Sequence, residues 1–212
     1  MKRIILKNIV VKGNRVEYIA EYPSEFAKFI SKNSTNLFVE YPEVYNLEKV
    51  PLGILTIPFV ANTLTVSMLL NMSISVPELD GTYMRSINTI KMVYKRMYPY
   101  MKTNFTVIAD KLTDTKYSGD KSLLFFTGGL DATSALASLY NKKPLLVNIW
   151  GGDIPTADTI SHQETERYFS DLTSTTGLSY IFVKSNCREL YNEQLVTKKC
   201  AFKLLPWQNH GW

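Results

Sequence analysis

Residues 122–136 read Ser-Leu-Leu-Phe-Phe-Thr-Gly-Gly-Leu-Asp-Ala-Thr-Ser-Ala-Leu, and this stretch decides the expected fold. Its apolar run, Leu123–Phe126, predicts a short buried strand in a sheet that is covered on both faces. The strand ends at Thr127-Gly128-Gly129, and apolar residues at helical spacing then predict a helix from Asp131 to Tyr140. This succession predicts an anion site, because glycine lets backbone approach a phosphate and the first helical N–H groups have no partner.

The glycine turn differs from the two commonest nucleotide-binding loops. A Walker A loop requires a Lys followed by Ser or Thr, and no lysine occurs between Ser122 and Asn141. A dinucleotide fingerprint requires three spaced glycines, and only Gly128 and Gly129 are present. An ordinary strand-to-helix turn, in which Asp131 caps the helix, is the alternative that needs no ligand.

The segment Thr127-Gly128-Gly129-Leu130-Asp131-Ala132-Thr133 resembles the Ser-Gly-Gly-x-Asp-Ser/Thr signature of the PP-loop ATP pyrophosphatases, also called adenine nucleotide alpha hydrolase-like or HUP proteins. Thr127 replaces the usual Ser and keeps a hydroxyl. Ala132 replaces a Ser or Thr, and Thr133 and Ser134 follow it with hydroxyls of their own. Within the superfamily the chain looks most similar to 7-cyano-7-deazaguanine synthase-like proteins, although the zinc-binding cysteines of that enzyme are missing here.

The resemblance implies an enzyme that binds ATP with Mg²⁺, adenylates a substrate and releases pyrophosphate, as in ligases, amidotransferase-like enzymes and enzymes that modify tRNA or its bases. It implies catalytic roles for Thr127 and Asp131, and Mg²⁺ binding by Asp131 and Asp153. The implied ATP contacts are Thr127, Gly128, Gly129, Leu130, Asp131, Thr133, Asn148, Ile149 and Asp153. The substrate is expected to be an unidentified small molecule or an RNA.

Three strand–helix units follow one another from Lys121 onward. The expected strands are 122–126, 144–150 and 179–184, and the expected helices are 131–140, 158–175 and 188–204. This alternation predicts a parallel, doubly wound, Rossmann-like α/β sheet. Ligands of such sheets bind at the carboxyl ends of the strands. We therefore expect Thr127–Asp131, Gly151–Asp153 and Ser185–Cys187 to share one rim.

The N-terminal part, residues 1–115, predicts a smaller α+β region. Strands are expected over Arg3–Lys12, Arg15–Tyr22 and Asn36–Glu40, with a turn at Gly13-Asn14, and a helix is expected over Thr82–Tyr98. Residues 111–120 read as a polar connector. The PP-loop domain would then span residues 121–212 and contain fewer strands than the family fold. The missing strands would come from the N-terminal half, from a partner subunit or oligomer, or from a longer protein of which this chain is a fragment, the option we favour.

The composition is that of a soluble globular chain: 212 residues, of which 45% are hydrophobic and 20% charged. Polar residues interrupt the apolar stretch Val60–Val76, so we expect a buried element rather than a membrane span, and a cytoplasmic protein. Two cysteines, Cys187 and Cys200, and two histidines, His162 and His210, are too few and too scattered to predict a zinc site. Cys187 is retained as a candidate nucleophile.

The formal charge is +5, and Arg85, Lys91, Lys95, Arg96 and Lys102 form a run without acids. This run predicts either a surface for phosphates such as RNA or an ordinary solvated helix face. Two functions other than ATP-dependent catalysis stay open. The chain is either a non-catalytic nucleotide-binding module, or a subunit of a multi-protein assembly such as a defence system.

Overall fold

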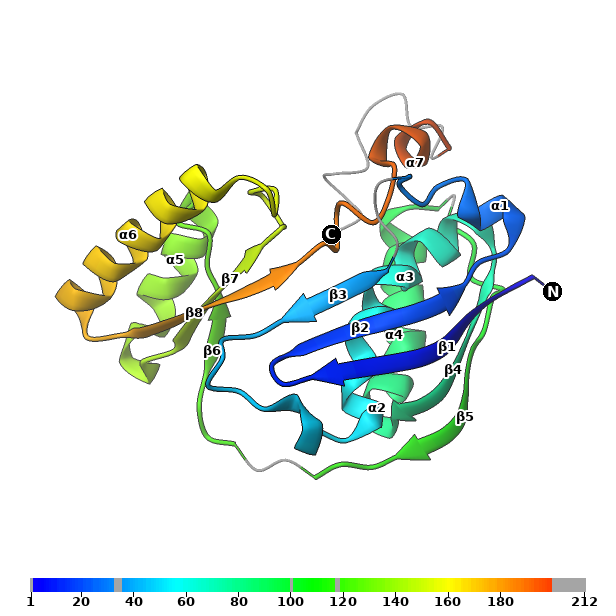
Figure 1. Cartoon of the computed structure of the whole chain (residues 1–212), viewed down its shortest axis with the longest axis horizontal. Coiled ribbons are helices and arrows are strands. Elements are labelled where there is room, and N and C mark those ends of the chain that lie inside the picture. The colour runs from blue at the N-terminus through cyan, green and yellow to red at the C-terminus, as the bar shows by residue number, and fades with distance from the viewer. Residues whose placement is uncertain (1, 33–35, 100, 117–118, 200–212) are drawn as a thin grey trace.

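The computed structural model describes residues 2–32, 36–99, 101–116 and 119–199, which form a mixed α/β fold around one eight-stranded sheet (Figure 1). The strands are β1 Arg3–Lys12, β2 Arg15–Glu21, β3 Leu37–Glu40, β4 Ser73–Asp80, β5 Val107–Thr113, β6 Leu123–Phe125, β7 Leu145–Trp150 and β8 Ser179–Ser185. The helices are α1 Ser24–Ala27, α2 Leu52–Leu55, α3 Ile57–Leu70, α4 Gly81–Met97, α5 Leu130–Leu139, α6 Thr159–Thr176 and α7 Glu193–Lys199.

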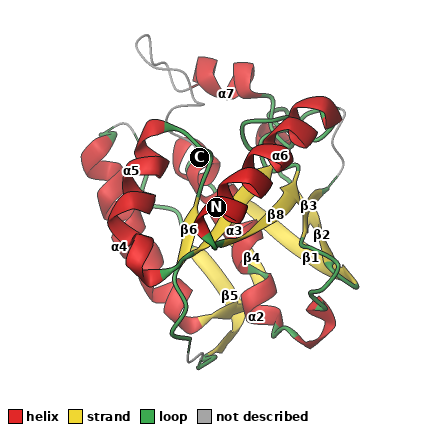
Figure 2. Ribbon diagram, turned by 90° about the vertical axis from the view of Figure 1, so that its left-hand side faces the viewer, coloured by secondary structure: helices red, strands yellow, loops and turns green. Residues whose placement is uncertain are grey.

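The strand order is β5-β4-β1-β2-β3-β8-β7-β6, so strands from both halves of the chain belong to the same sheet. Two parallel wings, β1-β4-β5 and β6-β7-β8, flank an antiparallel centre made by β1, β2, β3 and β8. Figure 2 shows the twisted strands crossing the middle of the molecule with helices outside them. The three expected parallel strands thus lie side by side, and their carboxyl ends share one edge as predicted.

Local sequence signals explain most of the elements. The hairpin between β1 and β2 turns at Gly13, whose φ of 59° is a left-handed conformation that glycine adopts without strain. Helix α6 begins after Asp158, whose carboxylate accepts the N–H of Ser161 at 3.0 Å, and ends at Gly177 with φ 69°. These elements confirm the expected hairpin and the expected second helix.

Helix α3 is the central core helix. It carries apolar residues on all sides, as fully buried helices do, and packs on the sheet through fully buried side chains such as Phe59 and Val60. The Tyr18 ring stacks 5.8 Å from Phe59, and the Tyr18 hydroxyl donates to the Leu55 carbonyl at 2.7 Å. The segment Leu52–Leu70 is long and apolar enough to cross a membrane, but 67% of it is buried within the fold. It therefore serves as a core element, as the interrupted apolar stretch predicts.

Strands β3 and β8 join the two halves of the sheet through a short antiparallel ladder with two residue pairs, Val39–Ser185 and Glu40–Lys184. The buried Asn186 extends this joint, because its side chain accepts the Phe38 N–H at 2.9 Å and donates to the Asn36 carbonyl at 2.8 Å. The Ser185 hydroxyl adds a bond to the Phe38 carbonyl at 2.7 Å. Polar side chains thus hold this joint as much as the ladder does.

Strand β6 corrects the first expectation. We expected a buried strand covered on both faces, yet β6 lies at the edge of the sheet and, in the described part of the chain, pairs with β7 alone. Leu123 is 52% exposed and Phe125 66% exposed, while Phe126 just beyond the strand is buried. An apolar run shows that side chains favour burial, but it does not show whether an element covers each face.

Three other expectations need correction. The third helix was expected from Arg188, but residues 187–190 form turns and α7 begins at Glu193; the expected end at Leu204 lies outside the described residues. The expected polar connector begins instead as the last part of β5, which pairs with β4 through Lys111 and Leu112. Helical spacing in the sequence places Ile87 and Met97 on one apolar face of α4, but only Ile87 is buried, and Met97 is 60% exposed.

Candidate functional site

The loop after β6 has the expected geometry of a strand, a glycine turn and a helix start. Gly128 has a φ of +81°, which side chains rarely tolerate, and a Cβ there would lie 3.1 Å from the Tyr168 ring. Helix α5 then starts at Leu130 with Gly129 as its N-cap residue. Gly128 is therefore required by the turn itself, whatever the loop binds.

Gly129 is different, because neither its backbone conformation nor a close neighbour requires a glycine there, and its role in the fold is that of an N-cap residue. Its φ of −70° and ψ of 170° are ordinary for any residue, and a Cβ would meet only the Thr127 hydroxyl oxygen at an unstrained 3.6 Å. Glycine carries an entropic cost that a residue with a side chain avoids. A glycine that neither conformation nor contact requires, on an exposed loop, leaves room for a ligand to approach the backbone.

The start of α5 offers donors toward this open space. Thr133 is the first residue whose N–H bonds to a carbonyl of the turn, that of Gly129 at 2.9 Å, so the N–H groups of the preceding helical residues have no carbonyl of the helix to bind. Thr127, Asp131 and Thr133 are exposed beside them, as is Leu130, which is 86% exposed. Asp131 makes no capping bond, so the alternative in which it merely caps the helix lacks its hydrogen bond.

The Ala132 side chain points away from the loop and toward the sheet. It packs against the smaller apolar cluster that α5 and α6 form on the sheet, which contains Phe126, Leu136 and Phe169. A hydroxyl at this position would enter that cluster rather than the loop. Thr133 and Ser134 are the exposed hydroxyl residues of this first turn.

Three of the expected ATP contacts, Asn148, Ile149 and Asp153, lie at the end of β7 or in the loop that follows it, which we call the second loop. Each of them already has a partner within the fold. The Asn148 side chain is buried and donates to the Phe126 carbonyl at 3.0 Å, so it anchors the end of β6 next to the glycine turn. The Ile149 carbonyl accepts the Gly152 N–H at 3.0 Å. Asp153 is 77% exposed and lies 3.7 Å from the guanidinium of Arg188.

The loops after β7 and β8 touch at Gly151. Its φ is +106°, and a Cβ there would lie 1.7 Å from the Ser185 carbonyl oxygen. The Arg188 guanidinium donates to the Gly152 carbonyl at 2.9 Å, and the Cys187 sulfur lies 3.9 Å from the Gly151 carbonyl. Burial raises the pKa of the Cys187 thiol, the opposite of what a cysteine nucleophile needs. Cys200 lies outside the described residues.

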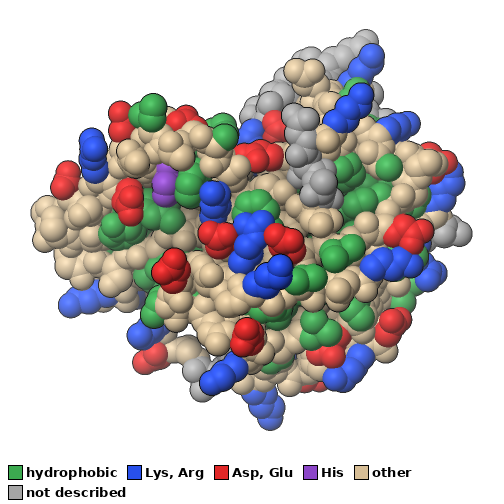
Figure 3. Space-filling model, viewed as in Figure 1, with side chains coloured by type: hydrophobic (Ala, Val, Ile, Leu, Met, Phe, Trp, Pro, Cys, Tyr) green, Lys and Arg blue, Asp and Glu red, His purple; other side chains and the backbone are tan. Residues whose placement is uncertain are grey.

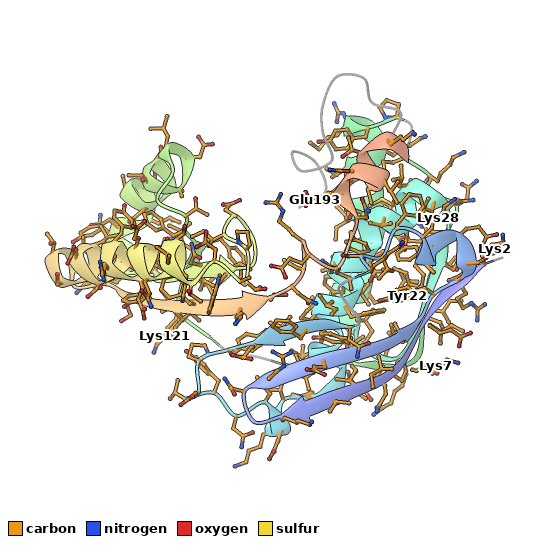
Figure 4. The ribbon with its side chains drawn as sticks, turned by 45° about the horizontal axis from the view of Figure 1, so that its top comes forward. Lys2, Lys7, Tyr22, Lys28, Lys121 and Glu193 are labelled. Carbon is orange, nitrogen blue, oxygen red and sulfur yellow. The ribbon has the colours of Figure 1, made fainter. Side chains whose placement is uncertain are left out.

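A cleft of about 1040 Å³ opens beside this second loop, and sequence reasoning missed most of it. Gly151–Asp153 forms one side, and residues from β2, β3 and the segment after β8 form the other. Its charged residues are Arg15, Glu17, Asp153, Arg188, Glu189 and Glu193. Figure 3 shows acidic and basic side chains side by side in the middle of this face, and Figure 4 shows Glu193 at the start of α7.

Both arginines of the cleft are paired with carboxylates, and Glu189 accepts the N–H and hydroxyl of Thr156. Arg15 binds Glu40 at 2.9 Å and Glu17 at 2.8 Å, and its guanidinium lies 3.7 Å from the centre of the Phe38 ring. Arg188 binds Glu193 at 2.9 Å. No residue of the glycine turn lines this cleft. The structure thus places the first-loop residues together at the sheet edge, and places Asp153 in the cleft.

His162 lies between aromatic rings on the α6 side of the sheet. Its ring stacks 3.8 Å from Trp150 and meets Phe182 edge to face at 4.8 Å. Burial lowers the pKa of His162, and Lys184 lowers it further while Glu166 raises it. The imidazole therefore belongs to a packed aromatic cluster. His210 lies outside the described residues.

We expect the stability of the protein to fall as the pH decreases below 6.5, the ordinary pKa of histidine, because the unfolded chain then binds a proton that folded His162 resists. Thermal unfolding at about pH 7.5 and pH 5.5 measures this loss. The His162→Phe variant keeps a ring on Trp150 and should lose less stability over this range. Equal losses in both proteins would show that His162 does not contribute.

Metal ligands are sparse in the described part of the chain, which contains no group of three or more His, Cys, Asp or Glu residues placed to hold an ion. Asp131 is an exposed carboxylate beside the glycine turn, and carboxylates are donors that Mg²⁺ uses when nucleotide phosphates supply its other ligands. The Asp153 carboxylate, in contrast, already lies 3.7 Å from the Arg188 guanidinium. Asp131 therefore fits a nucleotide-bound Mg²⁺ better than Asp153 does.

Comparisons with protein-family models, curated proteins and solved structures find no match to this chain.

Proposed function

We propose that the chain binds ATP at the loop Thr127–Asp131 and adenylates a substrate with release of pyrophosphate. The observation that carries this proposal is Gly129, a glycine that neither conformation nor contact requires, at a helix start with exposed N–H groups. The unit β6-α5-β7-α6-β8, with its parallel neighbouring strands, agrees with a Rossmann-like PP-loop domain. Use of ATP agrees with the cytoplasmic location inferred from composition.

In this proposal the backbone of Gly128–Asp131 and the Thr127 hydroxyl hold the pyrophosphate that leaves when a substrate oxygen attacks the alpha phosphate. Charge accumulates on that leaving group in the transition state, and donors fixed in advance by the turn stabilise it without reorganisation. Asp131 holds Mg²⁺, which neutralises phosphate charge when it is bound. Thr133 supplies a further hydroxyl in the first helical turn.

The adenine would then lie against the end of β7. The carbonyl of Ile149 and the side chain of Asn148 are engaged within the fold, so these residues shape that end of the site through the positions that they fix. The substrate, a small molecule or an RNA with an oxygen to adenylate, would enter from the cleft beside Gly151–Asp153. Asp153 lines this cleft.

The Gly129→Ala variant tests the proposal. We expect its melting temperature without ligand to equal that of the parent or to lie slightly below it, since alanine fits this backbone and restricts the unfolded chain but is a poorer N-cap residue than glycine. We expect its affinity for Mg·ATP to fall about tenfold or more, because the new methyl group occupies the space that the phosphates need. Calorimetric titration with Mg·ATP measures the affinity.

Gly119→Ala is the matched control, since Gly119 is also exposed and a Cβ there meets nothing within 4 Å. Asp131→Asn should weaken binding of Mg·ATP more than binding of ATP in the presence of a chelator. If Gly129→Ala and Asp131→Asn both bind Mg·ATP as the parent does, the loop is not the nucleotide site.

Ala132 favours a second candidate, a module that binds a nucleotide without catalysis. Its position within the apolar cluster leaves the loop without the hydroxyl that the PP-loop signature carries there. Pyrophosphate release across a panel of carboxylate, amide and nucleobase substrates separates the two candidates. Binding of Mg·ATP without any pyrophosphate would establish the module.

A further inference from the structure

Residues 81–109 concentrate the positive charge of the protein. They contain Arg85, Lys91, Lys95, Arg96 and Lys102 and neither Asp nor Glu. Since the whole chain has a net charge of +5, the remainder is balanced in formal charge. The excess charge therefore lies on α4 and the segment that follows it.

Apolar side chains are exposed on the same helix. Met92 is 66% exposed, Val93 48% and Met97 60%, but around the helix Val93 and Met97 lie about 100° and 140° from Met92. The buried side of α4 packs on the core through other residues, among them Ile87 and Tyr94. An exposed, flexible methionine side chain such as Met92 is typical of surfaces that bind other proteins.

A groove of about 500 Å³ runs beside Met92. It is lined by Asn88, Lys91, Met92, Lys95, Arg96 and Thr103, and we call it the α4 groove. The Lys91 ammonium donates to the Phe105 carbonyl at 2.7 Å, and burial without a carboxylate partner lowers its pKa. The Lys95 ammonium donates to the carbonyls of Pro99 and Met101. These bonds hold both cations along the border of the groove.

The free cations in this region are few. Arg85 binds Asp114 at 3.3 Å, and Lys91 and Lys95 bind carbonyls, whereas Arg96 and Lys102 have no side-chain partner within the described ranges. A nucleic acid needs a series of cations along its phosphates, and single strands also need exposed aromatic rings to stack on. Among the described residues of this region, the most exposed apolar side chains are not aromatic. The balance favours a polypeptide over a nucleic acid.

We propose that the α4 groove docks a segment of a partner protein that carries apolar side chains flanked by carboxylates. Its apolar side chains would cover Met92, and its carboxylates would bind Arg96 and the ammonium groups of Lys91 and Lys95. Such a ligand matches both features of the groove, the exposed Met92 side chain and the uncompensated charge. The proposal does not depend on ATP binding at the loop Thr127–Asp131.

The test uses the full chain and a fluorescent synthetic peptide with Leu at helical spacing and Glu between the leucines. Fluorescence anisotropy should show binding that weakens at high salt, and no binding of the same peptide with Lys in place of Glu. Arg96→Gln should weaken binding about tenfold and reduce its salt dependence. Met92→Gln should weaken binding and leave the salt dependence unchanged.

Lys49→Gln and Ile160→Gln are the matched controls, because both residues are exposed and lie on other elements. Equal effects of the controls, or no peptide binding at about 1 mM, would overturn the proposal. Binding of a uridine oligomer in place of the peptide would make the groove a nucleic-acid surface and also overturn it. A dimer in light scattering that Arg96→Gln dissolves would make a second copy of the chain the occupant instead.

Discussion

Replacing Gly151 by alanine is expected to destabilise the protein by about 3–5 kcal/mol, since a strained backbone and an overpacked contact each cost about 1–3 kcal/mol. The added Cβ would lie 1.7 Å from the Ser185 carbonyl oxygen and 2.9 Å from a Thr156 methyl carbon, at a φ of +106° that alanine avoids. Because the clash is with backbone, the ends of β7 and β8 would have to separate. The melting temperature should fall by about 6–20 °C for a chain of this length.

Gly177→Ala is the matched control for this loss. Gly177 also has a positive φ, +69°, but a Cβ there meets nothing within 4 Å. It should therefore show only the cost of the left-handed conformation, about 1–2 kcal/mol. If the two variants unfold at the same temperature, the close approach at Ser185 does not constrain the fold.

Replacing Asn186 by alanine is expected to cost about 2–4 kcal/mol. The variant leaves the Phe38 N–H and the Asn36 carbonyl at the β3–β8 joint without their partner, and each unpaired buried group costs about 1–3 kcal/mol. Urea unfolding measures the loss as a lower midpoint. If the slope of the unfolding free energy against urea concentration is unchanged, the two halves of the sheet still unfold together.

Asn192→Ala provides the comparison at an exposed position, since the Asn192 side chain accepts the Leu195 N–H at 3.1 Å at the start of α7. Its loss should be clearly smaller than that of Asn186→Ala. A loss below about 1 kcal/mol for Asn186→Ala would mean that water replaces its bonds and that the joint is held by the ladder alone.

The elements with strong local signals could be predicted from the sequence. Gly13 marked the first hairpin, and Asp158 and Gly177 marked the ends of α6, because turns and caps depend on the few residues that form them. The position of β6 could not be predicted, since its exposed edge depends on which strands arrive beside it. The pairing of β3 with β8 joins residues far apart in the chain and has no local signature.

Part of the candidate site could likewise be predicted from the sequence, and part of it could not. The turn at Thr127–Asp131 could be predicted, because the strand, the glycines and the helix start are contiguous. The cleft could not, since Arg15 and Arg188 reach it from opposite ends of the chain. The inward orientation of Ala132 also depends on the helical turn that places it against Phe126 and Phe169, which a motif comparison does not contain.

The β3–β8 joint also has a consequence for synthesis on the ribosome. Phe38 and Ser185 bond to each other although they are 147 residues apart, so β3 is made well before its partner strand exists. At about 5–20 residues per second, this interval lasts about 7–30 s. Throughout it one side of β3 has no strand to pair with, and the nascent chain exposes hydrogen-bonding groups that other nascent chains can bind. The edge of β3 therefore stays open to association with other chains until β8 has been made.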